Sequence, residues 1–276
     1  MSVAIVGAGN LGGAVAAGLV ASGAVDASTL RCVTRSEEGA ARLRARLADL
    51  PGGTAVTVTT DAVAAVAGAD VVMLGVKPYA LVDVLRELGP HLVPGVTIVS
   101  LAAGVELDDL VAAAPEGAQV VRLMTNTPVQ VRAAVSLVAA APGTDADALA
   151  RVVALADALG TTHVLDEDRF DAATALAGSG PAYVFLLVEL LRDAGVGLGL
   201  DADVALTMAR DMVDGAARLL VASDDDPESL RRAVTSPGGM TAAAIAVFED
   251  AGLRTTVAEA LAAAVARAAE LKAPPA

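Results

Sequence analysis

Hydrophobic and polar positions in the first part of the chain alternate between short β-branched runs and longer helical stretches. Val3–Val6 is typical of a buried strand, and a helix is predicted from Asn10 to Ser22 after a glycine-containing loop. Further strands are predicted at 29–35, 55–60, 70–76, 97–103, 119–125 and 133–141. Because helical or turn segments lie between these runs, the order indicates an α/β fold with a doubly wound parallel sheet.

The pattern changes at about residue 166, where helical patterns replace strands. One helix is predicted to end near Ala177, with a break at 178–180 and a new helix that has Pro181 at its first position. From Ala182 to Leu191 the new helix is apolar nearly all round, so both of its faces must be buried. One small domain can hardly bury such a helix alone, which suggests a subunit interface.

The remaining helices carry recognisable start signals. One is predicted over 201–223, one starts with Asp226 as N-cap before Pro227, and one runs from Thr256 to Lys272 with Thr256 and Glu259 as a capping box. The tail at 273–276 is expected to fray. We therefore predict two domains, an α/β domain at 1–164 and an all-helical domain at 165–276.

Composition and charge narrow the classes of partner. The chain has 276 residues, 55% hydrophobic and 19% charged, and a formal net charge of −14 with no cluster of lysine and arginine, which argues against nucleic acid. Cys32 is the only cysteine, so we expect no internal disulfide and a reducing compartment. The N-terminus lacks a basic signal-peptide region, and the apolar stretch 182–191 contains Glu189 and is too short to span a bilayer. We expect a cytoplasmic protein that binds no membrane.

A glycine motif between the first strand and the first helix predicts a dinucleotide site. Gly7, Gly9 and Gly12 match G-x-G-x-x-G, which permits a tight turn, close approach of a pyrophosphate, and close packing of helix on strand. This makes 1–164 a Rossmann NAD(P)-binding domain. The second strand runs into Arg35 and Ser36, with no carboxylate until Glu37, so a 2′-phosphate is favoured and NADPH is the expected cofactor. NADH remains possible.

Three other loops carry candidate chemistry. Lys77 ends the fourth predicted strand and Asn126 the sixth, where ligands bind in such sheets. In the helical part, "TSPGGMT" (235–241) leads into a helix whose N-terminus favours an anion. This second loop is predicted to hold the anionic end of a substrate, with the Thr241 hydroxyl near the reacting group.

The motifs "GAGNLG", "VKP", "MTNTP", "LAGSGPAY" and "VTSPGGMT" occur in the order and spacing of the pyrroline-5-carboxylate reductases, which the chain resembles from end to end. The resemblance implies reduction of 1-pyrroline-5-carboxylate to L-proline by NADPH or NADH, the last step of proline biosynthesis. It also implies helical domains that interlock into homodimers, often assembled further into decamers.

The resemblance assigns residues to roles. Thr241 and Ser179 would be the catalytic residues, with Ser179 beside the substrate. Substrate would be bound by Ser236, Gly238, Gly239, Met240 and Thr241. Cofactor would be bound by Val6, Gly7, Ala8, Gly9, Asn10, Leu11, Gly12, Arg35, Ser36, Val76, Lys77, Pro78 and Asn126.

Two positions depart from the family pattern. Ala62 stands where an asparagine commonly touches the NADP ribose, which weakens the NADPH preference without reversing it. Met240 stands where many relatives have threonine, so contact there must be mainly through backbone N–H groups.

Reduction of a protonated cyclic imine needs orientation rather than a nucleophile or a metal. The proton donor stays open between Thr241 and a bound water, and we expect no chemical role for His91 or His163. The alternatives are a related imine reductase, a β-hydroxyacid dehydrogenase, or a non-catalytic NADPH sensor. The dehydrogenases need a helix-borne lysine as acid, and the only lysine after Lys77 is Lys272.

Overall fold

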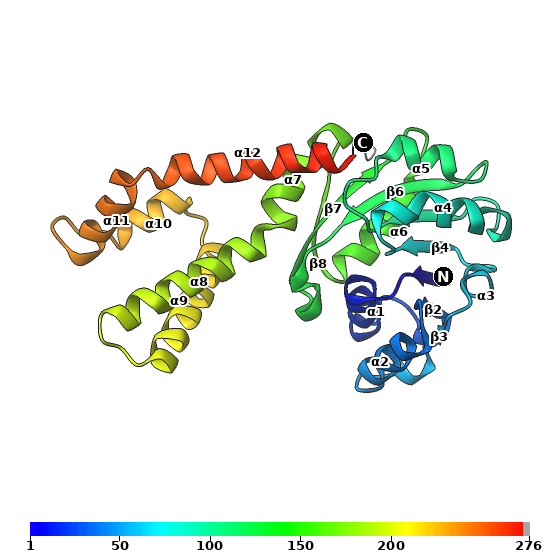
Figure 1. Cartoon of the computed structure of the whole chain (residues 1–276), viewed down its shortest axis with the longest axis horizontal. Helices are drawn as coiled ribbons and strands as arrows, with labels where there is room; N and C mark the ends of the chain where they lie inside the picture. The colour runs from blue at the N-terminus through cyan, green and yellow to red at the C-terminus, as the bar shows by residue number, and fades with distance from the viewer. Residues whose placement is uncertain (273–276) are drawn as a thin grey trace. The chain divides into compact units, whose positions relative to one another are not determined.

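The computed structural model describes residues 1–272, which form two compact units (Figure 1). The first comprises Met1–Ser179 and the end of helix α12 (Leu253–Lys272) from Val265 onward, and the second comprises Gly180–Ala264. The sequence-based division at 164 and 165 separates strands from helices and stays a prediction. The expected fraying of 273–276 lies outside the described residues.

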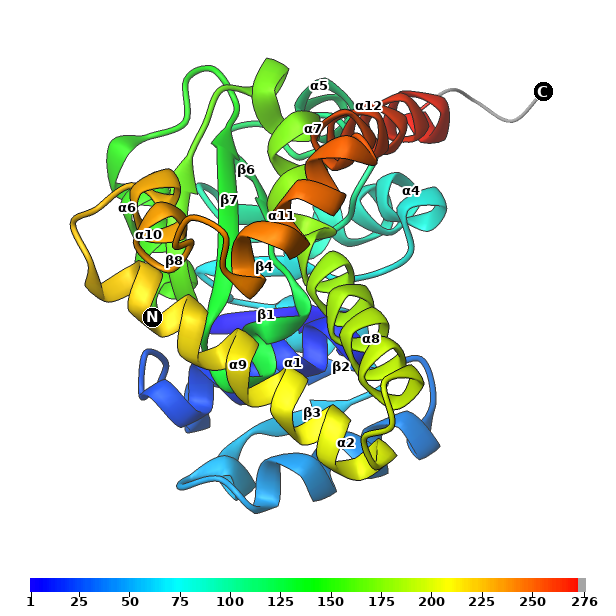
Figure 2. The same ribbon diagram turned by 90° about the vertical axis from the view of Figure 1, so that its left-hand side faces the viewer.

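The first unit is built on one eight-stranded sheet in the order β3-β2-β1-β4-β5-β6-β7-β8 (Figure 2). Its strands are β1 (Val3–Val6), β2 (Leu30–Val33), β3 (Thr57–Thr59), β4 (Val71–Leu74), β5 (Thr97–Ser100), β6 (Gln119–Met124), β7 (Ala134–Ala140) and β8 (Gly160–Val164). All neighbouring pairs are parallel except β6 with β7. The predicted doubly wound sheet is thus confirmed, with β1 between β2 and β4 at its switch point.

The sheet differs from the prediction at the end formed by β7 and β8. Only the short helix η4 (Thr127–Val131) lies between β6 and β7, and a parallel crossover needs a dozen or more residues, so β7 returns antiparallel. Strand β8 was not predicted, because Thr161, Thr162 and His163 give it no alternating apolar pattern.

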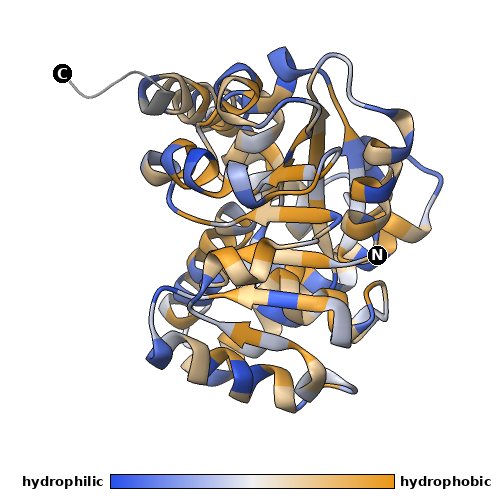
Figure 3. Ribbon diagram, turned by 90° about the vertical axis from the view of Figure 1, so that its right-hand side faces the viewer, coloured by the Kyte–Doolittle hydropathy of each residue, from blue (hydrophilic) through white to orange (hydrophobic). Residues whose placement is uncertain are grey.

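Helices cover both faces of the sheet because successive strand side chains point to opposite faces. Val3 and Ile5 join one core and Ala4 and Val6 the other, and the strands are largely hydrophobic (Figure 3). The first core is covered by α1 (Asn10–Ser22), α2 (Glu37–Ala48) and α6 (Ala146–Asp157). The second is covered by α3 (Ala62–Val66), α4 (Pro78–Leu88), α5 (Leu107–Ala113) and α7 (Phe170–Ala173).

The second unit is all helical. It contains α8 (Gly180–Gly197), α9 (Ala202–Ala222), α10 (Pro227–Ala233), α11 (Met240–Asp250) and α12 as far as Ala264. Helices α8 and α9 pack against each other across a short connection, as in an αα-hairpin (Figure 1). The predicted cap at Asp226 is confirmed, because its Oδ1 accepts a 2.9 Å bond from the Ser229 N–H.

The predicted start of the last helix was wrong. Helix α12 begins at Leu253, directly after Gly252, whose φ of +73° ends the preceding turn. Thr256 therefore lies inside the helix, where its Oγ1 donates to the Gly252 carbonyl at 3.3 Å, and it forms no capping box with Glu259.

The predicted break at 178–180 is narrower than expected and falls on Ser179 alone. Helix α7 continues into a π-helical turn, η6 (Thr174–Gly178), in which the Ser179 N–H bonds to the Thr174 carbonyl at 3.0 Å, and α8 begins at Gly180. Gly178 stays helical because the hydrogen bonds of the turn shift by one residue instead of ending.

The helical elements on the two sides of Ser179 together form a long apolar segment. The helical segment Glu167–Gly197 contains an 18-residue window of mean hydropathy 1.5 that is only 6% buried. By length and composition this longer segment is sufficient to cross a bilayer, whereas the apolar stretch 182–191 alone is too short. Within the described chain no side chain of α8 is buried, and Phe185, Leu187 and Leu190 are exposed.

Candidate active site

The first glycine loop joins β1 to α1 at the carboxyl end of the sheet. Gly7 has φ +90°, and a Cβ there would lie 2.6 Å from the Gly75 carbonyl carbon. A Cβ on Gly12 would lie 2.6 Å from the Gly7 carbonyl oxygen. Both glycines are therefore required by close backbone contacts, within the loop and with the segment after β4.

Gly9, in contrast, makes no close contact that would require glycine. A Cβ at Gly9 would meet no atom within 4 Å, so the chain itself does not require glycine at this position. Gly9 is also the N-cap of α1, and no side chain caps that end of the helix in the described structure. The first-turn N–H groups of α1 have no intrahelical acceptor and face the positive end of the helix dipole. Open space above unpaired N–H groups fits a pyrophosphate.

The other residues predicted for this loop have different exposures. Val6 and Ala8 are buried, Leu11 is half-buried, and Asn10 is exposed. The Ala8 N–H bonds to the Val33 carbonyl at 2.7 Å, which ties the loop to the end of β2. Val6 and Ala8 can therefore meet a ligand only through their backbone.

The loop after β2 presents Arg35 and Ser36 to solvent. The Ser36 Oγ caps α2 by accepting a 3.2 Å bond from the Gly39 N–H. Glu37 is held by Thr60 Oγ1 at 3.3 Å and by Arg44 Nη1 at 3.6 Å. Arg35 forms no ion pair with any residue in 1–272, so its guanidinium is available for a phosphate.

The loops after β3 and β4 complete this edge of the sheet. Asp61 caps α3 by accepting a 3.0 Å bond from the Ala64 N–H, and Ala62 follows as the first helical residue. Lys77 is the exposed N-cap of α4 and Pro78 its first residue, while Val76 is half-buried. Since β1, β2 and β4 are neighbours, their carboxyl-end loops lie at one switch point.

Asn126 lies in the turn after β6 and is only 6% exposed. Its Nδ2 donates to the Ala177 carbonyl at 2.9 Å, and its Oδ1 accepts from the Val135 N–H at 3.1 Å. The amide therefore links the start of β7 to the π-helical turn. Its predicted contact with the cofactor stays a prediction.

Ser179 is the last residue of the first unit and is exposed at the end of the π-helical turn. A Cβ on the preceding Gly178 would lie 3.1 Å from Thr174 Cγ2 and 3.4 Å from Met124 Cε. The turn thus packs tightly against the end of β6.

The second glycine loop lies between α10 and α11 in the second unit. Gly238 has φ +70°, and the Gly239 N–H bonds to the Ser236 carbonyl at 3.0 Å. A Cβ on Gly239 would lie 2.6 Å from Ser236 Oγ and 3.1 Å from the Ser236 carbonyl oxygen, so a larger residue there would displace the Ser236 side chain. Met240 is 92% exposed, and Thr241 is exposed.

Helix α11, like α1, begins after a glycine N-cap. Gly239 is its N-cap, and no described side chain caps it. The first-turn N–H groups of α11 are therefore open to an anion. The candidate residues form two sets, with Ser236, Gly238, Gly239, Met240 and Thr241 in the second unit and all the others in the first.

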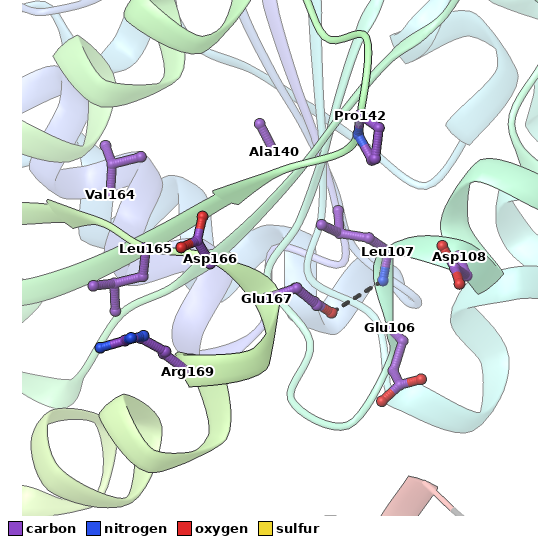
Figure 4. Close-up of a pocket in the computed structure, with 10 residues that line it drawn as sticks. All are labelled: Glu106, Leu107, Asp108, Ala140, Pro142, Val164, Leu165, Asp166, Glu167 and Arg169. Carbon is purple, nitrogen blue, oxygen red and sulfur yellow. Dashed lines mark hydrogen bonds between the residues drawn. The ribbon is translucent and has the colours of Figure 1, made fainter.

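A pocket of about 760 Å³ in the first unit contains none of these candidates (Figure 4). It lies between the start of α5, the end of β7 and the segment after β8. In it Glu167 Oε1 accepts a 3.2 Å bond from the Leu107 N–H and also pairs with Arg122, which is buried in β6. Sequence reasoning missed this pair; the signal was a lone arginine inside the apolar run of β6.

Other reactive groups lie away from these loops. His91 and His163 are exposed, in helix η3 (Gly89–His91) and in β8. Burial raises the pKa of the Cys32 thiol to about 12, so it is no nucleophile near neutral pH. No group of three or more His, Cys, Asp or Glu side chains in 1–272 could hold a metal ion.

Two protein families match parts of the chain. Residues 167–271 match the family "Pyrroline-5-carboxylate reductase dimerisation", and residues 2–104 match "NADP oxidoreductase coenzyme F420-dependent". The first match coincides with the helices whose apolar face is exposed in one chain, and it supports a homo-oligomer.

Relatives match over nearly the whole length. A pyrroline-5-carboxylate reductase from Pseudomonas aeruginosa is 41% identical over 98% of this chain and 96% of that protein. The structure of a pyrroline-5-carboxylate reductase from Coxiella burnetii has a TM-score of 0.90 and 33% identity, covering 99% of each chain. The Plasmodium falciparum pyrroline carboxylate reductase, whose structure has NADP bound, is 24% identical with a TM-score of 0.86 over 99% and 98% of the chains, a likeness of fold. The chain belongs to the pyrroline-5-carboxylate reductase family.

Proposed function

We propose that this protein reduces 1-pyrroline-5-carboxylate to L-proline with NAD(P)H, the last step of proline biosynthesis. The observation that carries the proposal is the pair of glycine-capped helices, α1 and α11, one in each unit. Each offers unpaired N–H groups to an anion, and the reaction requires two anionic ligands, a dinucleotide and a carboxylate. When bound, the nicotinamide cofactor supplies the hydride that reduces the imine carbon.

In this proposal residues 1–164 form the cofactor domain. The N–H groups of Asn10 and Leu11 hold the pyrophosphate, and Gly9 leaves the space in front of them open. The free guanidinium of Arg35 with the N-terminus of α2 at Ser36 receives a 2′-phosphate. Val76, Lys77 and Pro78 line the channel at the end of β4. Because Glu37 is already engaged by Thr60 and Arg44, the loop after β2 favours NADPH over NADH.

Residues 165–276 form the dimerisation and substrate domain. The first turn of α11, at Met240 and Thr241, binds the substrate carboxylate mainly through backbone N–H groups, and Gly239 holds the loop that leads into it. The Thr241 hydroxyl orients the ring nitrogen, and Ser179 lies beside the ring. The residues act by binding and orienting a substrate that is already electrophilic when its nitrogen is protonated.

The exposed apolar face of α8 is covered in this proposal by a second copy of the chain. A dimer, or a decamer built from dimers, buries Phe185, Leu187 and Leu190 without a membrane. The strongly negative net charge leaves no partner role for nucleic acid, and the cytoplasm is the proposed location.

The proposal is tested by following the near-ultraviolet absorbance of the reduced nicotinamide with racemic pyrroline-5-carboxylate. Oxidation that depends on the imine supports the reductase, and the ratio of the rates with NADPH and NADH measures the cofactor preference. Binding of NADPH without turnover on this imine would refute the proposed substrate.

The substrate role of the second loop is tested with Thr241→Ala. Turnover should fall much more than NADPH affinity, because Thr241 is assigned to the substrate side. The matched control is Thr255→Ala, an exposed threonine at the start of α12, which should leave both unchanged. Equal losses of turnover and NADPH affinity in Thr241→Ala would contradict the assignment.

A further inference from the structure

We propose that Asn126 is a positioning residue for this reaction, whose buried amide fixes the π-helical turn and thereby the place of Ser179. The inference rests on the proposed function, in which Ser179 lies beside the substrate. It assigns the Asn126 side chain to the protein's own backbone.

The π-helical turn has a cause in the sequence. In an α-helix the Ala177 carbonyl would accept a bond from residue 181, but residue 181 is proline, which has no N–H. The proline ring also clashes with the carbonyl four residues earlier, which is that of Ala177. The turn widens to η6, and the Ala177 carbonyl loses its α-helical donor.

Asn126 supplies the missing donor. Its Nδ2 reaches the Ala177 carbonyl at 2.9 Å, while its Oδ1 is held by the Val135 N–H at 3.1 Å. Both ends of the amide are therefore fixed, and the 6% exposure leaves little access for water to replace it. An unpaired carbonyl that is partly buried is costly, so the bond selects one position of the turn.

The anchored turn determines where Ser179 lies. The Ser179 N–H bonds back across the turn to the Thr174 carbonyl at 3.0 Å, and a Cβ on Gly178 would lie 3.1 Å from Thr174 Cγ2 and 3.4 Å from Met124 Cε, so the turn packs closely there. Met124 and Asn126 come from the end of β6. Ser179 is therefore held on the unit that carries the first glycine loop.

The test uses Asn126→Asp, which preserves shape. The introduced carboxyl still accepts from the Val135 N–H, but when ionised it offers the Ala177 carbonyl no donor. Burial beside a carbonyl oxygen raises the pKa of such a carboxyl, and on protonation it can donate again. Relative to wild type at the same pH, kcat/KM for the imine should fall roughly 10- to 100-fold at alkaline pH and recover as the pH is lowered. NADPH affinity should change little.

The matched control is Ser136→Ala. It removes a neighbouring buried bond between β7 and the end of β6, from Ser136 Oγ to Thr125 Oγ1 at 3.1 Å, which does not reach the π-helical turn. Its kcat/KM should keep the wild-type pH profile. Hydrogen exchange at 174–180 should be faster in Asn126→Asp at alkaline pH and unchanged in Ser136→Ala.

A double-mutant cycle with Ser179→Ala completes the test. If Asn126 acts through Ser179, Asn126→Asp should cost far less in the Ser179→Ala background than in wild type. An equal cost in both backgrounds, or a loss independent of pH, would overturn the proposal. Absence of wild-type turnover would refute the proposed function alone, since the exchange comparison still tests the anchor.

Discussion

The Cζ atom of Arg122 lies 4.3 Å from the centroid of the Phe170 ring, so the guanidinium of β6 stacks on the first residue of α7. The same guanidinium pairs with Glu167, and the Arg122 side chain is only 3% exposed. A buried cation of this kind depends on its counter-ion.

Glu167→Gln should therefore destabilise the first unit strongly. The Glu167 side chain is 32% exposed, so water partly compensates for the lost ion pair. We expect the free energy of unfolding to fall by about 3 kcal/mol. The measurement is urea unfolding at fixed protein concentration. Glu38→Gln removes an exposed pair with Arg42 in the same unit and should cost less than about 1 kcal/mol. Similar losses in the two variants would show that the buried pair contributes no more to stability than the exposed pair.

The glycines of the first loop should separate folding from cofactor binding. Gly7→Ala places a Cβ against the backbone at a positive φ, and should destabilise the fold by more than about 2 kcal/mol. Gly9→Ala meets no protein atom and should leave stability within about 0.5 kcal/mol of wild type. Its methyl group occupies the proposed pyrophosphate path, so the Kd for NADPH should rise roughly tenfold or more.

Thermal unfolding and titration of NADPH fluorescence check this pair of variants. If Gly9→Ala binds NADPH with wild-type affinity, the pyrophosphate does not pass over Gly9.

The features predicted correctly from sequence are those that depend on local signals. Val3–Val6 and Asn10–Ser22 were placed to the residue because a β-branched run, a glycine turn and an apolar helix follow one another directly. The cap at Asp226 was equally local, since its partner is three residues away.

The missed features depend on residues distant in sequence. Strand β8 is held by pairing with β7, and its own side chains carry no strand pattern. The π-helical turn at 174–178 is bonded to Asn126, which lies 51 residues from Ala177. The Arg122–Glu167 pair likewise joins residues 45 positions apart. The only sequence signal was the arginine inside the apolar run of β6, and no local pattern identifies Glu167 as its partner.

Cys32 should be protected by the fold. Burial raises the pKa of its thiol from the ordinary value of 9.0 to about 12, so the native protein holds the proton that the unfolded chain loses. Stability from this group is complete below pH 9 and should decline as the pH rises from 9 towards 12. A thiol reagent at mildly alkaline pH should react only as fast as the protein opens, and at full speed in denaturant. Rapid labelling of the native protein would contradict the buried placement.

Arg35 should decide between the two nicotinamide cofactors. It is exposed and forms no ion pair within residues 1–272, so a 2′-phosphate would be its main partner. A hydrogen bond to a charged group contributes about 1.5–3 kcal/mol, so Arg35→Ala should raise the Kd for NADPH by roughly 10- to 100-fold. The Kd for NADH should stay unchanged, because NADH lacks that phosphate.

The matched control is Arg42→Ala, which changes an exposed arginine of α2 and should alter neither affinity. Raising the ionic strength should weaken NADPH binding to wild type more than to Arg35→Ala, because the screened charge pair is already lost in the variant. Equal weakening of NADPH and NADH by Arg35→Ala would place the arginine elsewhere on the cofactor and leave the 2′-phosphate to the N-terminus of α2.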